Sequence, residues 1–461
     1  MRFDMFIDRH MKGPGGILDL IEIATPLVVT FACETVMMFT DRLFLSRLSG
    51  AHMAAAMGGG LTAFTFMTFF LGIIGYGNAM VAQQYGAKKK MRCPVVTTQL
   101  LILAITAYPI ILVSIPIGYR LFVFAGISEQ QLVQQQAYFT LLMFGTIVPL
   151  LRNSIGSFFS GIGRTRIQMI AAFTSMVLNV GLNYILIFGK FGLPALGIQG
   201  AAIGTIIAGI TGMLVLIGAY LKPPLVDEFA IGKSFRFDKD LMAELLHLGY
   251  PAGLEMLLNL VAFSTMVTIF HSGGEAVATA ITIVFNWDMV SFVQMIGVNI
   301  AVTSLAGRFY GANNIRAVYR SAHSGLKIAC CYCAILVLPF LFFTDFLVNM
   351  FLAETTGNLL QIREMALFMV KLITVYLFCD AVLQVFGGAL RGVGDTFWSM
   401  VVSVIIHWSF ALIVFAALKL LQLDAKTTWV IVIGVFMFFG PVYYLRFRSG
   451  KWKKNNTTKE V

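Results

Sequence analysis

Five carboxylates lie within long apolar stretches of this 461-residue chain: Glu34, Asp41, Glu255, Asp288 and Asp380. Ionisable groups inside membrane-spanning segments are costly and usually have a function. Carboxylate oxygens suit hard cations such as Na⁺, and burial drives a carboxyl toward its protonated form. The chemistry that these residues favour is therefore an exchange among a proton, a Na⁺ ion and an organic cation.

Asp380 has the most informative neighbours. Tyr376, Asp380 and Gln384 follow one another at intervals of four residues, which places a phenol, a carboxylate and an amide on one helical face. Glu255 lies four residues after Pro251, and a proline inside a helix frees a backbone carbonyl about one turn away. A carboxylate beside a freed carbonyl favours a cation site.

The roles of three other groups stay open at this stage. Glu34 and Asp41 share a helical face, and Asp41 is either a solvated pair with Arg42 at the membrane edge or part of a cavity. Asp288 has either a proton or substrate role or a structural hydrogen bond to a neighbouring helix. Asn179 and Asn183, also four residues apart, line the cavity or hold helices together.

The composition requires a lipid environment. The chain is 58% hydrophobic and only 12% charged, whereas ordinary globular chains carry about 25% charged residues. Long apolar runs predict an all-α polytopic protein with twelve membrane-spanning helices. We expect them near residues 16–41, 55–82, 94–118, 131–152, 166–188, 198–221, 241–270, 277–305, 321–345, 360–386, 398–420 and 427–445.

The positive charges are distributed unevenly. Most of the 33 Lys and Arg residues fall in the N-terminus, in alternate loops and in the C-terminal tail. By the positive-inside rule this places both termini in the cytoplasm of a cell inner membrane protein. The net charge of +11 is thus assigned to membrane topology and not to nucleic acid, and the basic tail is expected to lie near anionic lipid.

The second half of the chain repeats the first. Pro26 and Tyr85-Gly86-Ala87 recur with one offset as Pro251 and Tyr310-Gly311-Ala312, and the glycines after Gly156 recur after Gly387. Parallel repeats around a central cavity are a recurring transporter plan. We predict an N-lobe at residues 1–221, a cytoplasmic linker at 222–240, a C-lobe at 241–446 and a basic tail at 447–461. The repeat aligns Asp380 with Pro149 and Glu255 with Thr30, so both acids are particular to the second half.

Motifs of ATP-driven pumps and of enzymes are missing. Gly232-Lys233-Ser234 lacks the upstream glycine of a phosphate-binding loop. No nucleophile–base pair or metal cluster is evident in the sequence, so we expect a transporter that is not an enzyme.

Several motifs in order resemble the multidrug and toxin extrusion (MATE) family over nearly the whole chain, in particular its NorM-like branch. They are Thr40-Asp41-Arg42, Val81-Ala82-Gln83-Gln84-Tyr85-Gly86-Ala87, Leu178-Asn179-Val180-Gly181-Leu182-Asn183, Gly197-Ile198-Gln199-Gly200 and Ala389-Leu390-Arg391-Gly392. The resemblance implies two homologous six-helix bundles forming a V around a central cavity. It also implies a monomer that exports drugs by multidrug efflux, through antiport of organic cations against Na⁺ or H⁺.

The resemblance assigns roles to residues. It makes Glu255, Asp380 and Tyr376 the cation site, with Na⁺ favoured and H⁺ as the alternative. It makes Asp41 the first-helix acid of the substrate cavity, which we expect to include Glu34, Asp288, Asn179, Asn183 and Gln384 as well. Asn183 replaces an aspartate found in the DinF-like branch, and Asp288 is a further departure that favours protons.

Two alternatives remain open from sequence. A lipid-linked saccharide flippase of the wider superfamily shares the repeat plan, but it needs a more basic cavity than these acids provide. A membrane-embedded enzyme or a channel is a second alternative. The physiological substrate is a drug-like organic cation or a related metabolite.

Overall fold

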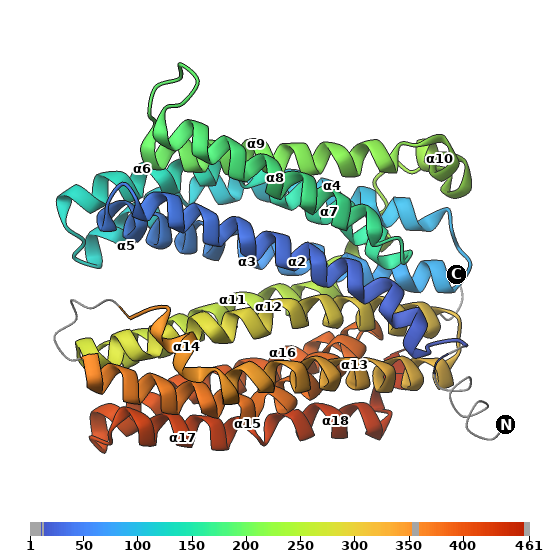
Figure 1. Cartoon of the computed structure of the whole chain (residues 1–461). Coiled ribbons are helices and arrows are strands. Elements are labelled where there is room, and N and C mark those ends of the chain that lie inside the picture. The colour runs from blue at the N-terminus through green and yellow to red at the C-terminus, as the bar shows by residue number, and fades with distance from the viewer. Residues whose placement is uncertain (1–10, 12, 353–358, 456–461) are drawn as a thin grey trace. The chain divides into compact units, whose positions relative to one another are not determined.

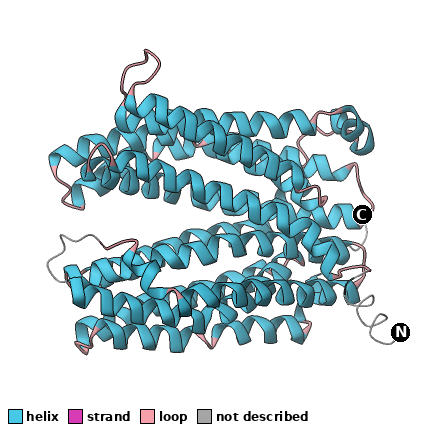
Figure 2. Cartoon of the chain, in the orientation of Figure 1, coloured by secondary structure: helices cyan, strands magenta, loops and turns pink. Residues whose placement is uncertain are grey.

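The chain forms helices and connecting loops throughout the part that the structure describes (Figures 1 and 2). The computed structural model describes residue 11, residues 13–352 and residues 359–455. The basic residues of the extreme N-terminus and residues 456–461 of the predicted tail lie outside the described residues. The prediction of an all-α fold is confirmed.

Within the described residues, twelve helical segments are long and apolar enough to cross a membrane, as the sequence predicts. They are α2 (Ile17–Ser46), α3 (Gly50–Gly86), α4 (Arg92–Val113), α6 with α7 (Glu129–Gly145, Ile147–Gly161), α8 (Arg166–Phe188), α9 (Gly197–Tyr220), α11 (Lys239–His271), α12 (Glu275–Gly311), α13 (Ile315–Phe342), α15 (Leu359–Gly392), α16 (Thr396–Phe415) with a π-helical turn (Ala416–Leu420), and α17 with α18 (Ala425–Phe436, Phe439–Ser449).

Shorter helices connect the spans. They are α5 (Ile115–Phe124), α10 (Pro223–Phe229), α14 (Thr344–Asn349) and two 3₁₀ turns at Ile231–Lys233 and Lys451–Asn455.

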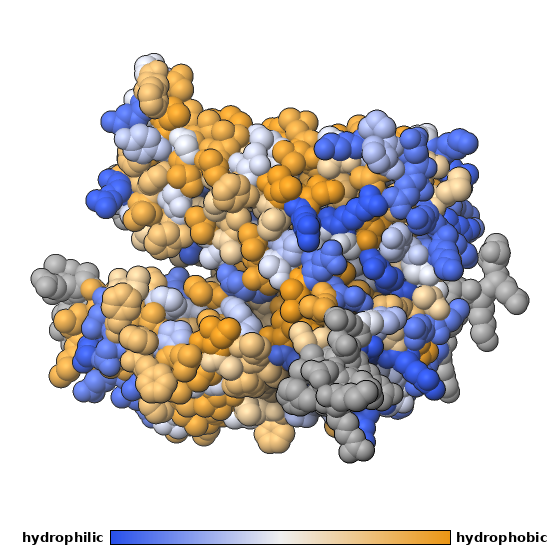
Figure 3. Space-filling view, turned by 45° about the vertical axis from the view of Figure 1, so that its right-hand side comes forward, coloured by the Kyte–Doolittle hydropathy of each residue, from blue (hydrophilic) through white to orange (hydrophobic). Residues whose placement is uncertain are grey.

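The flanks of the helices are apolar. Side chains on span surfaces, such as Ile105 and Leu412, are more than half exposed at 60% and 65%. In Figure 3 apolar residues cover most of the visible flank, and hydrophilic residues gather toward one end of the helices. Soluble proteins rarely expose so much apolar surface to water, so the fold belongs to a multi-pass membrane protein.

The helices form two compact units, which divide the chain at unexpected places. The N-unit comprises Pro26–Leu257, and the C-unit comprises Met1–Thr25 together with Leu258–Val461. These boundaries lie inside α2 and α11, and not in the segment at 222–240 where we predict the linker between lobes.

Close helix packing explains both boundaries. At the start of α2, Leu20 is fully buried and the Gly15 carbonyl accepts a hydrogen bond from Ser324 Oγ of α13 at 2.9 Å, within the C-unit. In the N-unit, Gly253 of α11 lies directly against α3. A Cβ on Gly72 would lie 2.6 Å from the Gly253 Cα atom, so the two backbones touch.

The segment predicted as a linker is packed on the N-unit. Phe229 of α10 is fully buried, with its ring centroid 5.3 Å from that of Phe158 and 6.1 Å from that of Tyr85. Buried Gln99 binds the chain that follows, because its Nε2 donates to the Arg236 carbonyl at 2.9 Å and its Oε1 accepts from the Asp238 amide at 3.1 Å.

Charge pairing supports the same attachment at the surface. Glu228 accepts from Lys90 Nζ at 2.9 Å and from Arg164 Nη2 at 2.7 Å. The hydrogen bond from Lys90, together with that from Arg164, lowers the pKa of the Glu228 carboxyl below its usual range. Glu228 is therefore ionised at neutral pH, although exposed pairs of this kind stabilise only weakly.

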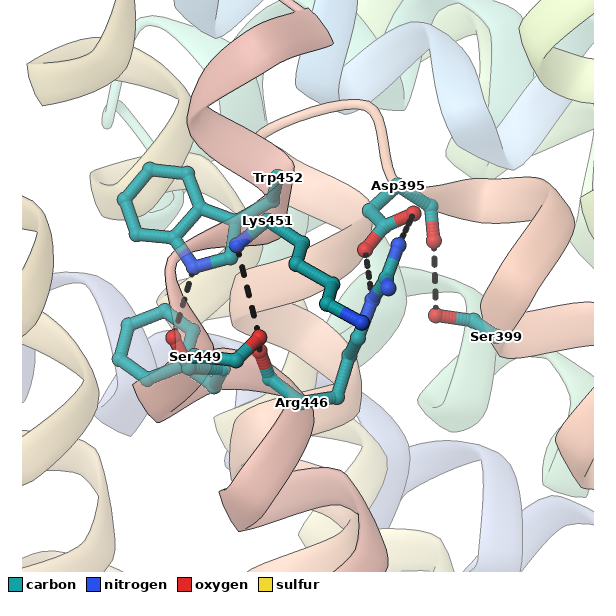
Figure 4. Close-up of polar contacts among 7 residues, drawn as sticks. Asp395, Ser399, Arg446, Ser449, Lys451 and Trp452 are labelled. Carbon is teal, nitrogen blue, oxygen red and sulfur yellow. Dashed lines mark hydrogen bonds and ion pairs between the residues drawn. The ribbon is translucent and has the colours of Figure 1, made fainter.

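The basic C-terminal segment is also partly structural. Arg446 of α18 binds both oxygens of Asp395, with Nε at 2.8 Å and Nη2 at 3.1 Å (Figure 4). Trp452 is fully buried and stacks on Phe447, and its Nε1 donates to the Phe447 carbonyl at 2.8 Å. These contacts bind the C-terminal segment to the C-unit independently of any contact with lipid.

One span extends further than the sequence predicts. We expect the fourth span to end at residue 152, but it continues to Gly161. Arg152, the last residue of the predicted span, therefore lies well inside the observed one. Its long apolar stem and its partner, described below, make this position tolerable.

The packing of α10 leads to a testable prediction. Phe229→Ala removes a fully buried ring, which costs about 3–5 kcal/mol where the surroundings cannot collapse. The segment 222–240 should then open more often, and trypsin should cut the detergent-solubilised protein at Lys233 or Arg236 about tenfold faster or more.

Phe235→Ala is the matched control, because Phe235 lies in the same segment and is 60% exposed. Its cleavage rate should equal that of the unmodified protein. Equal acceleration by both substitutions would show that the segment is not held by Phe229.

Candidate functional site

The polar stripe predicted on one helix is present in α15. Tyr376, Asp380 and Gln384 follow one face of α15, and Gln384 Nε2 lies 3.5 Å from Asp380 Oδ1. The Tyr376 hydroxyl donates a short hydrogen bond to the carboxylate of Asp288 on α12. Asp288 and Asp380 are near enough to interact electrostatically. The C-unit thus brings two carboxylates, a phenol and an amide together.

Glycines let α12 and α15, the two helices that carry this cluster, approach each other closely. A Cβ on Gly388 would lie 2.6 Å from the Asn299 carbonyl oxygen, and one on Gly392 would lie 2.5 Å from that of Thr303. Thr303 Oγ1 also donates to the Gly388 carbonyl at 2.9 Å. A side chain at either glycine would therefore push the two helices apart.

The polar contacts continue along the same pair of helices. Asn299 Nδ2 donates to the Gln384 carbonyl at 2.8 Å and to its Oε1 at 3.2 Å. Arg391 Nη1 lies 3.4 Å from Asn299 Oδ1. Gln384 is therefore fixed between Asp380 and Asn299, which orients its amide toward the carboxylate.

A second cluster surrounds Asp41 in the N-unit. Asn183 Nδ2 donates a short hydrogen bond to Asp41 Oδ1, and Thr205 Oγ1 donates to Oδ2 at 3.3 Å. Asn179 Nδ2 donates to Thr205 Oγ1 at 3.2 Å. Both asparagines are fully buried. Asp41 is thus held by neutral donors from α8 and α9, and is not solely a solvated partner of Arg42.

Small residues again make this contact possible. Gly204 of α9 packs directly on Asn183, so that a methyl group at position 204 would overlap Asn183 Oδ1. Asn183 and Asn179 lie one turn apart on α8, as their spacing predicts. Asn183 contacts Asp41 directly, and Asn179 contacts it through Thr205.

Glu34 has a charged partner in the same unit. Arg152 Nη2 of α7 lies 2.6 Å from Glu34 Oε1 of α2, and their side chains are 21% and 38% exposed. The pair joins two spans within the bilayer-crossing part of the fold.

Glu255 belongs to a different unit from the other two predicted cation ligands. It is half-buried on α11, in the N-unit, one turn after Pro251. Asp380 and Tyr376 belong to the C-unit. A common cation site that includes Glu255, Asp380 and Tyr376 therefore stays a prediction, whereas the contact of Tyr376 with Asp288 is observed.

A family model for MatE matches this chain twice, at residues 26–185 and 251–416. These two stretches cover most of the chain. The chain belongs to the MatE family.

The double match supports the internal repeat inferred from sequence, since each matched stretch begins at one of the paired prolines, Pro26 or Pro251. Membership of MatE also confirms the prediction of a transporter-family protein and not an enzyme.

Relatives named NorM resemble this MatE protein over nearly its full length. It is 27% identical over 447 residues to "Probable multidrug resistance protein NorM" of Thermotoga maritima, covering 95% of this chain and 93% of the relative. It is 26% identical over 389 residues to "Multidrug resistance protein NorM" of Vibrio cholerae, covering 82% of each. The predicted NorM-like branch is thereby confirmed.

Solved structures share the fold at lower identity. A MOP superfamily transporter from Pyrococcus furiosus, described as having a binding pocket of reversed polarity, matches with a TM-score of 0.87 at 19% identity, over 97% of this chain and 98% of that one. A multidrug resistance MATE transporter in an outward-facing conformation matches with a TM-score of 0.84 at 19% identity, over 97% and 99%. At such identity these matches establish the fold of the MatE protein.

Sequence reasoning missed two residues of these clusters. Thr205 bridges Asp41 and Asn179, but nothing distinguishes it from the other threonines of apolar helices. The charge of Arg152 indicates the end of the fourth span, because a charge beside an apolar run normally marks such an end, but the span continues to Gly161.

The packing of Gly204 on Asn183 can be tested by substitution. Gly204→Ala forces a methyl group into Asn183, and overpacking of this kind costs about 1–3 kcal/mol. We expect a lower melting temperature in detergent and reduced drug efflux by cells that produce the variant.

Gly218→Ala in the same helix is the matched control, since a Cβ at Gly218 meets nothing within 4 Å. Alanine favours helices over glycine, so this variant should be unchanged or slightly more stable. Indistinguishable behaviour of the two variants would contradict the close packing at Gly204.

Proposed function

We propose that this MatE protein is a cation-coupled antiporter that exports organic cations across the cell inner membrane. An entering cation, Na⁺ or a proton, drives export as two lobes expose the cavity to alternate sides. In this proposal the protein acts as a monomer with both termini in the cytoplasm. The relatives' names as multidrug resistance proteins support the choice of substrate class.

One observation carries the proposal: inside the membrane-spanning part of the C-unit, Tyr376, one helical turn from Asp380, donates a hydrogen bond to Asp288, so the two carboxylates belong to one cluster. Among the described residues, Asp288 accepts a hydrogen bond from Tyr376 and Asp380 accepts one from Gln384, and both donors are neutral. Two like charges in a low-dielectric setting repel each other, so a bound cation or proton is strongly favoured.

The oxygen donors of this cluster suit the proposed ions. Carboxylate, phenol and amide oxygens are hard ligands of the kind that Na⁺ takes. A carboxyl pair can instead share a proton, which makes H⁺ the other candidate. We favour Na⁺, and we include Glu255 as a third acid because a carboxylate near Pro251 lies beside a freed backbone carbonyl.

Antiport follows from competition for these groups. A cation bound to Asp288 and Asp380 stabilises the conformation in which the two carboxylates are close, so its release favours the other conformation. The substrate binds the two conformations with different affinities, and this difference couples the movement of the ion to the movement of the substrate.

The test is ethidium transport into proteoliposomes under either an imposed Na⁺ gradient or an imposed pH gradient. We expect one gradient alone to drive flux in the unmodified protein. Asp380→Asn and Asp288→Asn should each reduce this flux at least tenfold, because neutralising one carboxylate removes the repulsion that makes ion binding favourable. Glu255→Gln tests the third acid.

Glu275→Gln is the control, because Glu275 is an exposed acid on α12, the helix that carries Asp288. It should transport normally. Flux that persists in Asp380→Asn and Asp288→Asn under both gradients would rule out the C-unit cluster as the coupling site. Flux that requires neither gradient would rule out antiport.

A further inference from the structure

A chain of polar contacts runs from Arg391 to Asp380 between α12 and α15. Arg391 Nη1 lies 3.4 Å from Asn299 Oδ1, and Asn299 Nδ2 lies 3.2 Å from Gln384 Oε1. Gln384 Nε2 in turn lies 3.5 Å from Asp380 Oδ1. These links are long for hydrogen bonds, and what they determine is the direction in which each amide points.

Two groups of fixed polarity determine the orientation of Asn299. An arginine side chain only donates hydrogen bonds, so Asn299 turns its amide oxygen toward Arg391. A backbone carbonyl only accepts them, and Asn299 Nδ2 donates to the carbonyl of Gln384 at 2.8 Å. Asn299 is buried, at 6% exposure, so a reversed amide would leave polar groups unsatisfied, which is costly. Both neighbours therefore favour the same orientation.

The orientation of Asn299 determines that of Gln384. Because Asn299 presents its Nδ2 group, Gln384 turns its amide oxygen toward Asn299 and its NH₂ group toward Asp380. A reversed Gln384 amide would place two donor groups against each other at one end and two acceptor oxygens at the other. Asp380 therefore meets a hydrogen-bond donor, and the amide oxygen of Gln384 is directed away from the carboxylate.

The first repeat lacks this chain. At the offset that relates the paired prolines, Asn299 aligns with Ile74, which is fully buried. An isoleucine has no group that can orient a neighbouring amide. Asp380 likewise aligns with a residue that is not an acid, Pro149. The amide chain and the acid at its end thus occur together, in the second repeat only.

We propose that Asn299 is a positioning residue of the ion cluster: through Gln384 it keeps an N–H donor on Asp380, and this donor weakens Na⁺ binding so that the ion is released in each cycle. This role rests on the cation coupling proposed above and concerns the same cluster. An antiporter needs an ion site that empties as readily as it fills, and the amide chain supplies the partner that the empty site requires.

The donor affects the empty site and the occupied site differently. An N–H group stabilises an ionised carboxylate that has no cation beside it. A bound cation attracts the negative charge of the carboxylate and repels the positive end of the N–H bond, so the same contact stabilises the occupied site less. Asp380 loses part of this stabilisation when Na⁺ binds, and the affinity for Na⁺ is lower by that difference.

The test measures binding of radioactive Na⁺ to the purified full-length protein by equilibrium dialysis. We expect the unmodified protein to bind Na⁺. In Asn299→Leu a side chain of similar shape lacks the amide, so Gln384 is no longer held with its NH₂ group on Asp380. The Na⁺ concentration for half-saturation should fall about tenfold, the lower end of the range for one hydrogen bond to a charged group.

Gln384→Leu tests whether Asn299 acts through Gln384. Loss of the donor should also tighten Na⁺ binding, and Asn299→Leu should then change the affinity about twofold or less in the double variant. Weaker Na⁺ binding by Gln384→Leu would identify the Gln384 amide oxygen as an ion ligand and overturn the proposal. A full tenfold effect of Asn299→Leu in the absence of Gln384 would overturn it as well.

Thr303→Val is the matched control for packing between the two helices. Thr303 lies one turn from Asn299 on α12, and its Oγ1 donates to the backbone carbonyls of Asn299 and Gly388, each at 2.9 Å. Valine keeps its shape and leaves both amides in place, so the variant should melt at a lower temperature with unchanged Na⁺ affinity. An affinity shift equal to that of Asn299→Leu would identify Asn299 as a clamp between helices.

Transport separates this role from the proposed function. Under a Na⁺ gradient, Asn299→Leu should reach half-maximal ethidium flux at a lower Na⁺ concentration and show a lower maximal flux, because release of the ion is slower. Tighter Na⁺ binding without any gradient-driven flux would support the positioning role and refute cation-coupled export. Gradient-driven flux with unchanged Na⁺ affinity in Asn299→Leu would have the reverse meaning. An unmodified protein that binds no Na⁺ would overturn both.

Discussion

A charged side chain within a membrane span must find its partners inside the protein, because hydrocarbon offers neither donors nor countercharge. The clusters of this protein follow from that constraint. Asp41 is satisfied by Asn183 and Thr205, Glu34 by Arg152, and Asp288 by Tyr376. Each partner comes from a different helix than the acid. The acids therefore determine which helices must be adjacent, and polar hydrogen bonds in the membrane contribute to specificity as well as to stability.

Small residues supply the geometry that this pairing needs. Asp288 and Tyr376 meet between α12 and α15, the two helices whose backbones approach closely further along at Gly388 and Gly392. Asn183 reaches Asp41 while Gly204 lies against its amide. In both clusters the glycine has no polar function of its own. The absence of a Cβ at the glycine allows the close packing, since a Cβ there would push the neighbouring groups apart. The polar clusters thus lie between helices that pack closely through glycines, which have no polar side chain.

Local periodicity predicts much of this fold and part of the site. Twelve apolar runs predict the spans, and spacings of four residues place Asp380 beside Gln384 and Asn183 beside Asn179. The contact of Tyr376 with Asp288 joins residues 88 positions apart, and no periodicity within one helix encodes it. Hydropathy ends the predicted fourth span at Arg152 because a charge normally marks a boundary, whereas the Glu34 countercharge that makes Arg152 tolerable inside the span comes from another helix. The segment at 222–240 resembles a linker by composition, and the burial of Phe229 in the structure shows that it is packed.

The two units carry different kinds of charge, and this difference bears on how coupling works. In the N-unit, Asp41 is held by amide and hydroxyl donors and Glu34 by an arginine. In the C-unit, Asp288 and Asp380 interact electrostatically, and in the proposed mechanism a bound cation lowers their mutual repulsion. The repeat places Pro149 and Thr30 opposite Asp380 and Glu255, so this asymmetry arose in side chains and not in the backbone plan. The proposed coupling between the units requires a physical connection. The helices α2 and α11 provide one, since each belongs partly to both units and each contains a proline at the corresponding position of the repeat. A proline inside a helix removes one backbone hydrogen bond and favours a bend at that position. In the proposed mechanism, the effect of ion binding in the C-unit passes along α2, the helix that carries Glu34 and Asp41.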